Sequence, residues 1–176
     1  MFKKIAFSAL CAAVAFTSIG AAYAKDLKVA SNTTFPPFEF VNSKTNEITG
    51  FEMDLIKAMG KQAGYNVIIQ NMGFDGIIPG ILAGTVDVGA SGISITAERQ
   101  KKVLFTDPFY ESGLTILVNK NDADKIHGFA DLKGKKIAVQ IGTTAAAKAK
   151  EIPGATVVTF NHAGEATLEL SNGGAD

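Results

Sequence analysis

The sequence predicts an α/β protein whose parallel sheets are built from alternating strands and helices. Short apolar runs, which are typical of buried strands, recur at 27–30, 67–69 and 86–88. Segments with helical spacing or helix-start signals lie between these runs. The same pattern begins again at 137–139 and 156–160. Such alternation favours parallel sheets, in which ligands collect at the carboxyl ends of the strands.

Composition limits the function classes. The 176 residues are 47% hydrophobic and 19% charged, which is typical of a packed globular protein. The formal net charge is zero, so neither nucleic acid nor an anionic membrane surface is an expected partner. The two histidines, His127 and His162, lie in polar stretches without metal-ligand spacing, and we expect both on the solvated surface. No metal or cofactor is expected.

The first 24 residues have the pattern of a cleavable signal peptide. A basic start at Lys3 and Lys4 precedes an apolar run at 5–19, and Ala-Tyr-Ala at 22–24 supplies a small–x–small cleavage site. The apolar run is shorter than the roughly 20 residues of a membrane span. The mature chain is therefore expected to begin near residue 25 and to be exported.

The single cysteine of the chain would be removed on export. Cys11 lies inside the predicted signal peptide, so the mature chain is expected to have neither a disulfide nor thiol chemistry. The alternative is a lipoprotein acylated at Cys11. The preceding Ser-Ala-Leu at 8–10 lacks the small residue needed just before the cysteine, which disfavours it.

The first half of the mature chain contains most of the predicted elements. A strand at 27–30 is followed by an amphipathic helix at 51–64, whose apolar stripe of Met53, Ile56, Met59 and Ala63 predicts core packing. Further elements are expected as a strand at 67–69, a helix entered at about Asp75, a strand at 86–88, a short helix capped by Thr96, and a strand at 114–118.

Polar and aromatic residues gather just past these strand ends. Asn32, Ser91 and Ser94 follow two of the strands, and Phe35 stands on a loop stiffened by two prolines. Phe74 lies in the loop after the strand at 67–69. We expect Phe38 and Phe40 in the core and Phe35 in a small-molecule site.

A second group of residues has the features of an anion-binding site. Gly92, Ser94 and Thr96 leave free N–H groups and hydroxyls before the short helix, and Arg99 offers a bidentate fork for a carboxylate. The alternative is an ordinary corner with Arg99 on a solvated face. Further on, Thr143 and Thr144 open a helix at 145–150, a weaker signal of the same kind; the chain continues with a strand at 156–160 and a helix at 164–170.

Four motifs together resemble the type 3 extracellular solute-binding proteins, which are periplasmic receptors of polar amino-acid ABC importers. They are the helix start Gly-Phe-Glu-Met-Asp-Leu at 50–55, the loop motifs at 74–79 and 92–99, and Gly-Thr-Thr at 142–144. The resemblance extends over 26–176. It implies a periplasmic binding protein-like type II fold, with two parallel-sheet lobes and a cleft between them.

The resemblance also implies a role for each site residue. Arg99 would hold the α-carboxylate of a free L-amino acid, helped by Ser94 and Thr144, and Ser91 and Gly92 would receive the α-ammonium. Phe35 and Phe74 would sandwich the ligand side chain. The ligand-binding residues expected from the sequence are Asn32, Phe35, Phe74, Ser91, Gly92, Ser94, Arg99, Gln140, Thr143 and Thr144.

The chain departs from the family pattern at three places. Asn32 and Gln140 stand where receptors related to the glutamine-binding protein carry Asp and, in some members, Lys. Both changes remove charge near the ligand side chain, which favours a polar uncharged ligand such as glutamine and leaves a basic amino acid possible. Complete members continue beyond Asp176, and the acid that pairs with the ligand ammonium is expected there, so we expect a C-terminally truncated second lobe.

The predicted organisation is a signal peptide at 1–24, a first lobe at 25–118 and a partial second lobe at 119–176. The predicted function is periplasmic capture of an amino acid by a monomer that delivers it to an inner-membrane ABC permease. One alternative is the ligand-sensing module of a membrane receptor. The other is a periplasmic dehydratase or lyase on the same fold, which needs a catalytic acid or base in the cleft, whereas Glu39 and Asp107 are expected to be structural.

Overall fold

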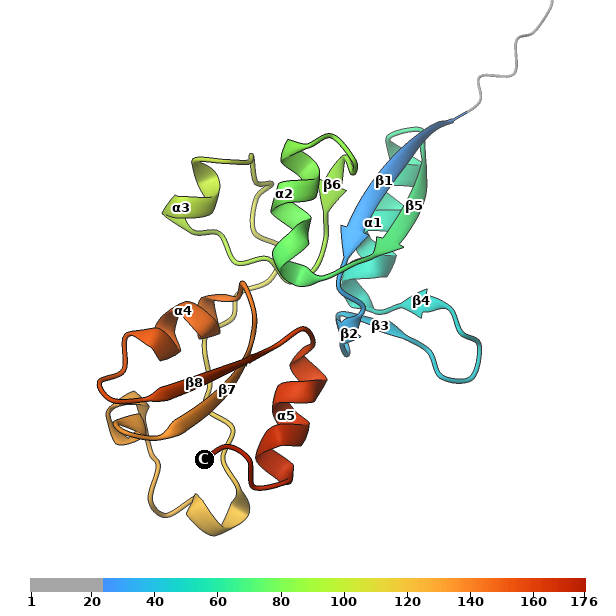
Figure 1. The fold of residues 1–176 in the computed structure, drawn as a ribbon. Coiled ribbons are helices and arrows are strands. Elements are labelled where there is room, and N and C mark those ends of the chain that lie inside the picture. The colour runs from blue at the N-terminus through green and yellow to red at the C-terminus, as the bar shows by residue number, and fades with distance from the viewer. Residues whose placement is uncertain (1–23) are drawn as a thin grey trace, which may run out of the picture.

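The computed structural model describes residues 24–176, arranged as two lobes around separate parallel sheets and joined by an extended segment (Figure 1). The predicted signal peptide, apart from residue 24, lies outside the described residues. Among residues 24–176, no helix is both long and apolar enough to cross a membrane. We keep the names first lobe and second lobe for residues 25–118 and 119–176.

The first lobe is built on a three-stranded parallel sheet in the order β5-β1-β6. Its strands are β1 (Lys25–Ser31), β5 (Tyr65–Asn71) and β6 (Val88–Gly89). The central strand β1 has neighbours on both sides, and its end is fully buried at Val29 and Ala30. The β-α-β-α-β order predicted for this lobe is confirmed, although β6 is shorter than the run at 86–88 suggested.

Helices α1 (Phe51–Gln62) and α2 (Ile77–Leu82) pack against opposite faces of this sheet. Successive side chains of a strand point to opposite faces. Val29 therefore packs with Met53 of α1, whereas its neighbour Ala30 packs with Ile77 of α2. These two clusters form the core of the first lobe, and they fix the end of β1 from which the polar residues emerge.

The predicted apolar stripe of α1 is only half right. Met53 is fully buried and Ile56 is partly buried, but Met59 is 48% exposed and Ala63 is exposed. The buried face continues instead through Gly60, where an added Cβ would lie 2.2 Å from Val67 Cγ2. This close approach of α1 to β5 turns the helix so that Met59 faces solvent.

A small antiparallel sheet beside the first lobe was not predicted from the sequence. It consists of β2 (Thr34–Phe35), β3 (Glu39–Val41) and β4 (Ile48–Thr49), in the order β2-β3-β4. After β5 the chain forms the 3₁₀ turn Phe74–Gly76 before α2, close to the predicted entry. The short helix α3 (Ala97–Gln100) begins as predicted, because the Thr96 hydroxyl accepts the Arg99 backbone N–H at 3.2 Å.

The second lobe repeats the strand–helix alternation around a two-stranded parallel sheet. Its elements are the 3₁₀ turns Lys120–Asp122 and Phe129–Leu132, β7 (Lys136–Gln140), α4 (Thr144–Lys150), β8 (Thr156–Phe160) and α5 (Ala163–Ser171). Val139 packs with Ala146 and Ala149 of α4, which forms one half of the core of this lobe. The strands and helices predicted for this part are confirmed to within two residues.

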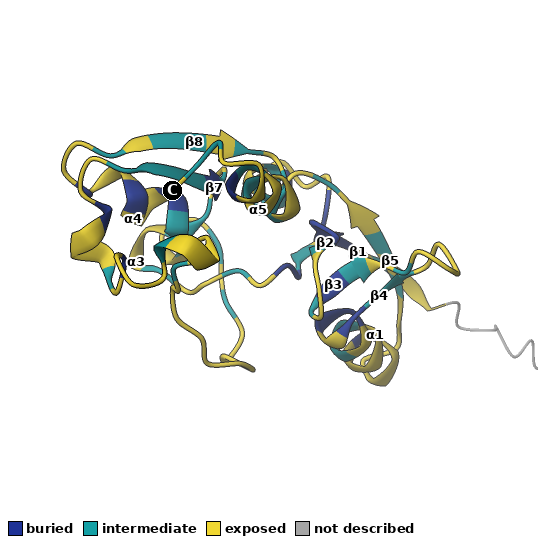
Figure 2. Cartoon of the chain, turned by 90° about the horizontal axis from the view of Figure 1, so that it is seen from below, coloured by how far each residue is buried: buried dark blue, intermediate teal, exposed yellow. Residues whose placement is uncertain are grey.

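The predicted strand at 114–118 is absent from the structure. The chain runs without regular structure through this segment, which joins the two lobes (Figures 1 and 2), and Leu117 is 64% exposed. A strand needs a neighbour for its ladder of hydrogen bonds, and this segment pairs with no strand of the described chain. Ile116 and Val118 pack instead against the second-lobe cluster around Ile126.

Candidate functional site

A cleft of about 1490 Å³ opens between the two lobes, and all ten predicted site residues line it. The cleft continues along the extended segment between the lobes, so it is larger than the roughly 300–1,000 Å³ of an ordinary small-molecule site. First-lobe residues reach it from the carboxyl ends of β1, β5 and β6. Second-lobe residues reach it from the end of β7 and the start of α4, as the topology predicts.

Arg99 is the principal cation in this cleft. Its guanidinium donates to the Ser94 carbonyl at 2.8 Å and to the Gly142 carbonyl of the second lobe at 3.0 Å. It also lies over the ring of Phe74, with Cζ 5.6 Å from the centroid. Burial lowers the pKa of Arg99, and the nearby Glu98 opposes that shift. Two of the five guanidinium donors are thus fixed by backbone carbonyls, and the other three have no hydrogen-bond partner among residues 24–176.

The Ser91–Gly92 loop is held from below by a buried carboxylate. The Gly92 N–H donates to Glu52 Oε2 at 2.7 Å, and the backbone of the preceding Ser91 also lowers the pKa of that carboxyl. Gly92 presents this N–H from a left-handed backbone conformation with φ +56°, which glycine adopts readily. Glu52 lies in the first turn of α1, where the helix dipole favours negative charge.

Glu39 adds a second carboxyl group beside Glu52. Glu39 is 1% exposed and Glu52 is 4% exposed, and Ser91 Oγ lies 3.2 Å from Glu39 Oε1. Burial, followed by repulsion from Glu52, raises the pKa of Glu39 to about 9. Burial also raises the pKa of Glu52, although the N–H groups of Gly92 and Ser91 oppose that shift. Of the two carboxyl groups, Glu39 is the one that burial favours as a neutral acid, and Glu52, which accepts the Gly92 N–H, is the one placed to hold a negative charge.

The Asn32 side chain bonds to residues of both lobes. Its Oδ1 accepts from Thr34 Oγ1 at 2.5 Å and from Gln140 Nε2 at 3.1 Å. Its Nδ2 donates to the Met72 carbonyl at 2.9 Å and lies 3.3 Å from His162 Nδ1. With Asn32 2% exposed, this amide joins the first lobe to the second in the structure. Its expected contact with a ligand side chain stays a prediction.

His162 differs from the sequence-based expectation. It is half-buried between the lobes beside Asn32, not solvated on the surface, because α5 begins at the edge of the cleft. The His162 backbone N–H donates to Glu165 Oε2 at 3.0 Å, which caps α5. His127 is exposed, as expected, and its ring lies 3.1 Å from the Asp124 carbonyl.

Aromatic rings line the first-lobe wall of the cleft. Phe35 is 49% exposed and stacks on Phe38 at a centroid distance of 5.9 Å. Tyr110 meets Phe38 edge-on at 4.9 Å, so the wall continues into the extended segment. Phe35 is therefore outside the core, as predicted. The prediction that Phe38 and Phe40 lie in the core is wrong: both are only half-buried, and Phe38 packs against the exposed rings of Phe35 and Tyr110 instead. The sandwich of a ligand between Phe35 and Phe74 stays a prediction.

The second lobe reaches the first at the turn before α4. Gly142 has φ +77°, and an added Cβ would lie 2.8 Å from the Asp75 Cβ. Thr143 caps α4 by accepting the Ala146 N–H at 3.1 Å, which confirms the predicted helix start. Thr144 begins α4 and lines the cleft. The turn before α4 thus meets Arg99 of α3 and Asp75 across the cleft.

Three residues near the cleft escaped the sequence analysis: Glu39 was treated as structural only, Glu52 as part of a helix motif, and His162 as surface. An acid at the second position of a helix ordinarily faces solvent, and only the fold reveals that these two acids are buried together. In the described part of the chain, no group of three His, Cys, Asp or Glu side chains is placed to hold a metal ion.

The fold and the cleft define a two-lobed α/β binding protein, and the sequence comparisons identify its family. The family model of the bacterial extracellular solute-binding proteins, family 3, matches residues 27–172. The chain belongs to this family. The predicted type II periplasmic binding fold is therefore confirmed, whereas the particular likeness to the glutamine-binding protein is not.

Named relatives bind amino acids. The chain is 37% identical to ABC transporter arginine-binding protein 1 of Escherichia coli K12 over 175 residues, which cover 99% of this chain and 69% of that protein. It is 38% identical to a probable histidine-binding protein of Campylobacter jejuni over 150 residues, covering 85% and 57%. The chain thus spans between 57% and 69% of the length of these two relatives.

Solved structures of amino-acid-binding proteins resemble this chain as well. An ancestral arginine-binding protein bound to arginine is 41% identical, with a TM-score of 0.83 over 88% of this chain and 69% of that one. The ancestral amino acid-binding protein AncCDT-1, a precursor of cyclohexadienyl dehydratase, is 45% identical, with a TM-score of 0.82 over 86% and 67%. An ancestral arginine-binding protein bound to glutamine is 42% identical, with a TM-score of 0.81 over 86% of this chain and 67% of that one.

Proposed function

We propose that this chain is the substrate-binding component of an ABC amino-acid importer. As a monomer, it would capture a free L-amino acid in the periplasm and deliver it to the membrane permease. The observation that carries the proposal is Arg99: its guanidinium is partly desolvated in the cleft and fixed by carbonyls of both lobes, and it keeps donors for a carboxylate.

The roles of the remaining residues follow from this placement. The carboxylate of the ligand would lie between Arg99 and the start of α4 at Thr144, with Ser94 and Thr143 beside them. The ammonium would lie against the carbonyl oxygens of Ser91 and Gly92. The hydrophobic part of the ligand would contact Phe35 and Phe74, and its polar end would face the amides of Asn32 and Gln140.

For the ligand we propose two candidates, glutamine and arginine. The neutral amides of Asn32 and Gln140 favour an uncharged polar group, which supports glutamine. The named relatives favour a basic amino acid, and ancestral arginine-binding proteins are described bound to arginine and bound to glutamine. The side-chain amides of Asn32 and Gln140 can both donate and accept hydrogen bonds, so a pocket that ends in them is consistent with binding of either glutamine or arginine.

The relatives also support the location. They include histidine-binding periplasmic proteins, and the predicted signal peptide at 1–24 agrees with export. The boundaries of the two lobes at 25–118 and 119–176 are part of the same proposal. Packing of Ile116 and Val118 against the second lobe indicates that the connection begins a few residues earlier than position 118.

We propose further that the chain is a binding protein and not an enzyme. Among the acids that line the cleft, Glu39 has the raised pKa expected of a general acid, but it is only 1% exposed and accepts the Ser91 hydroxyl, which argues against proton transfer to a substrate. No observation favours the sensor alternative.

The test is a thermal-shift screen of the exported chain against the twenty L-amino acids. We expect the melting temperature to rise with glutamine, arginine or both, by an amount that grows with ligand concentration. A flat response to all twenty would reject amino-acid binding by this chain. Incubation with prephenate and detection of a dehydrated product would reject the non-enzyme assignment.

A further inference from the structure

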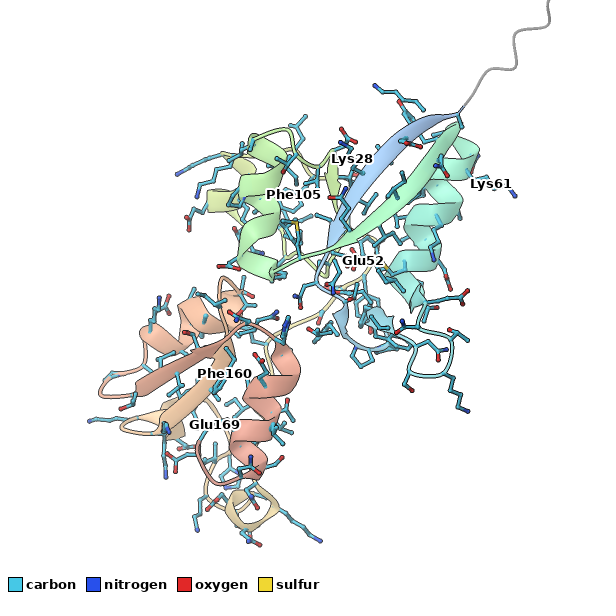
Figure 3. The ribbon with its side chains drawn as sticks, turned by 45° about the vertical axis from the view of Figure 1, so that its right-hand side comes forward. Lys28, Glu52, Lys61, Phe105, Phe160 and Glu169 are labelled. Carbon is cyan, nitrogen blue, oxygen red and sulfur yellow. The ribbon has the colours of Figure 1, made fainter. Side chains whose placement is uncertain are left out.

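The buried acids Glu39 and Glu52 form a carboxyl pair directly beneath the proposed ammonium site. Glu39 comes from β3 and Glu52 from the first turn of α1; Figure 3 shows Glu52 at the end of the first lobe that faces the second. Both line the inner wall of the cleft. The ion pairs of the described residues all lie elsewhere, so no cation neutralises this pair.

Hydrogen bonds indicate how the pair divides its charge. Glu52 accepts the Gly92 N–H at 2.7 Å, and this bond and the nearby Ser91 backbone both lower its pKa against the effect of burial, which suits a carboxylate. Glu39 Oε2 is fully buried and receives no hydrogen bond from any donor of the described chain. A protonated Glu39 resolves that deficit, because it can donate to the neighbouring Glu52 carboxylate. The pair then holds one proton and one negative charge.

The same hydrogen bonds fix the loop above. The Ser91 hydroxyl accepts the Asn32 N–H at 2.9 Å and lies 3.2 Å from Glu39, so it ties the end of β1 to the pair. The Gly92 N–H is engaged by Glu52, whereas the carbonyl oxygens of Ser91 and Gly92 are left for another partner. Within residues 24–176 neither carbonyl accepts a hydrogen bond, and both residues line the cleft.

We propose that Glu39 and Glu52 are positioning residues of the ligand site. They hold one proton and one negative charge between them and set the Ser91–Gly92 loop to receive an ammonium group. This inference rests on the proposed function for the identity of the ligand. A buried negative charge beneath two free carbonyls selects a cationic group at this end of the ligand, so it favours α-amino acids over carboxylic acids that lack the amine.

The first arm of the test needs no ligand. Infrared difference spectra between wild type and Glu39→Gln at neutral pH are expected to show one protonated carboxyl band that is lost in the variant. Glu47→Gln, an exposed acid next to β4, is the matched control and is expected to leave the band in place. Absence of the band in wild type would overturn the shared proton, whether or not any amino acid binds.

The second arm measures dissociation constants for arginine and for its des-amino analogue by calorimetry. Glu52→Gln removes the charge, so we expect affinity for arginine to fall about tenfold more than in Glu39→Gln, whose amide resembles the neutral acid. The analogue lacks the ammonium, so its affinity is expected to fall much less in Glu52→Gln. Equal losses for the two ligands would overturn the proposal and leave the pair a structural support.

The two arms separate the possible failures. If wild type binds no amino acid, the proposed function fails, while the infrared result still decides the shared proton. If Glu52→Gln does not fold, Glu52→Asp keeps the charge on a shorter side chain. It is then expected to retain the preference for arginine over the analogue, and loss of that preference with an intact fold would contradict the inference.

Discussion

Replacing Glu39 by glutamine should stabilise the protein at neutral pH. The pKa of Glu39 is raised from 4.5 to about 9 because the acid is buried beside Glu52. The folded protein therefore holds a proton that the unfolded chain releases above pH 4.5. In this range the unfolded state binds fewer protons, so the free energy of unfolding falls as pH rises, and the fall stops once Glu39 ionises in the folded state near pH 9.

The magnitude follows from the size of the shift. Each pH unit between the two pKa values costs the wild type about 1.4 kcal/mol. Near pH 7.5, roughly three units above the unfolded pKa, the cost is at most about 4 kcal/mol. Glutamine cannot ionise and keeps the shape of the neutral acid. The difference in unfolding free energy between Glu39→Gln and wild type should thus be near zero at pH 4.5 and grow with pH.

Urea denaturation followed by circular dichroism from pH 4.5 to 8 measures this difference. Glu47→Gln, which changes an exposed acid, serves as the control and should track the wild type at every pH. A Glu39→Gln variant that is destabilised throughout, or whose difference from wild type does not change with pH, would refute the reasoning. The first result would mean that Glu39 is ionised in the fold.

Two further predictions concern packing and closure. Met53→Ala should lower the free energy of unfolding by about 2–5 kcal/mol, because Met53 is fully buried between α1 and the sheet. Met59→Ala, at an exposed position, should lower it far less. Urea denaturation measures both changes. Gly142→Ala should weaken ligand binding at least about tenfold, because its Cβ would meet Asp75 and hold the lobes apart. Gly134→Ala is the control, because Gly134 has a similar positive φ and open space around it. Calorimetry should show unchanged affinity in this control. Equal affinities in the two variants would contradict closure of the lobes through Gly142.

The sequence was sufficient to predict those features that depend on local pattern and on the topology of the sheets. Alternating strands and helices located the parallel sheets, and because the ends of parallel strands meet at one edge, residues as distant as Asn32 and Arg99 could be placed in one cleft. Thr96 and Thr143 were correctly expected to begin helices, since capping depends on neighbours within three residues.

The rest depends on contacts that the sequence does not encode locally. The run at 114–118 has the composition of a strand but finds no strand to pair with. The position of Met59 is decided by the close approach of Gly60 to β5, and the burial of Glu39 and Glu52 by the meeting of two distant elements. His162 lies at the cleft because the second lobe brings the start of α5 beside Asn32.

The most direct test of amino-acid binding through Arg99 is calorimetric titration of glutamine and arginine into wild type and Arg99→Ala. Lys101→Ala, an exposed cation just past α3, is the control. Loss of a partly buried partner for a carboxylate should weaken binding by roughly 100-fold or more in Arg99→Ala and leave the control unchanged. Binding that survives in Arg99→Ala would show that the carboxylate is held elsewhere and would contradict the account of the site.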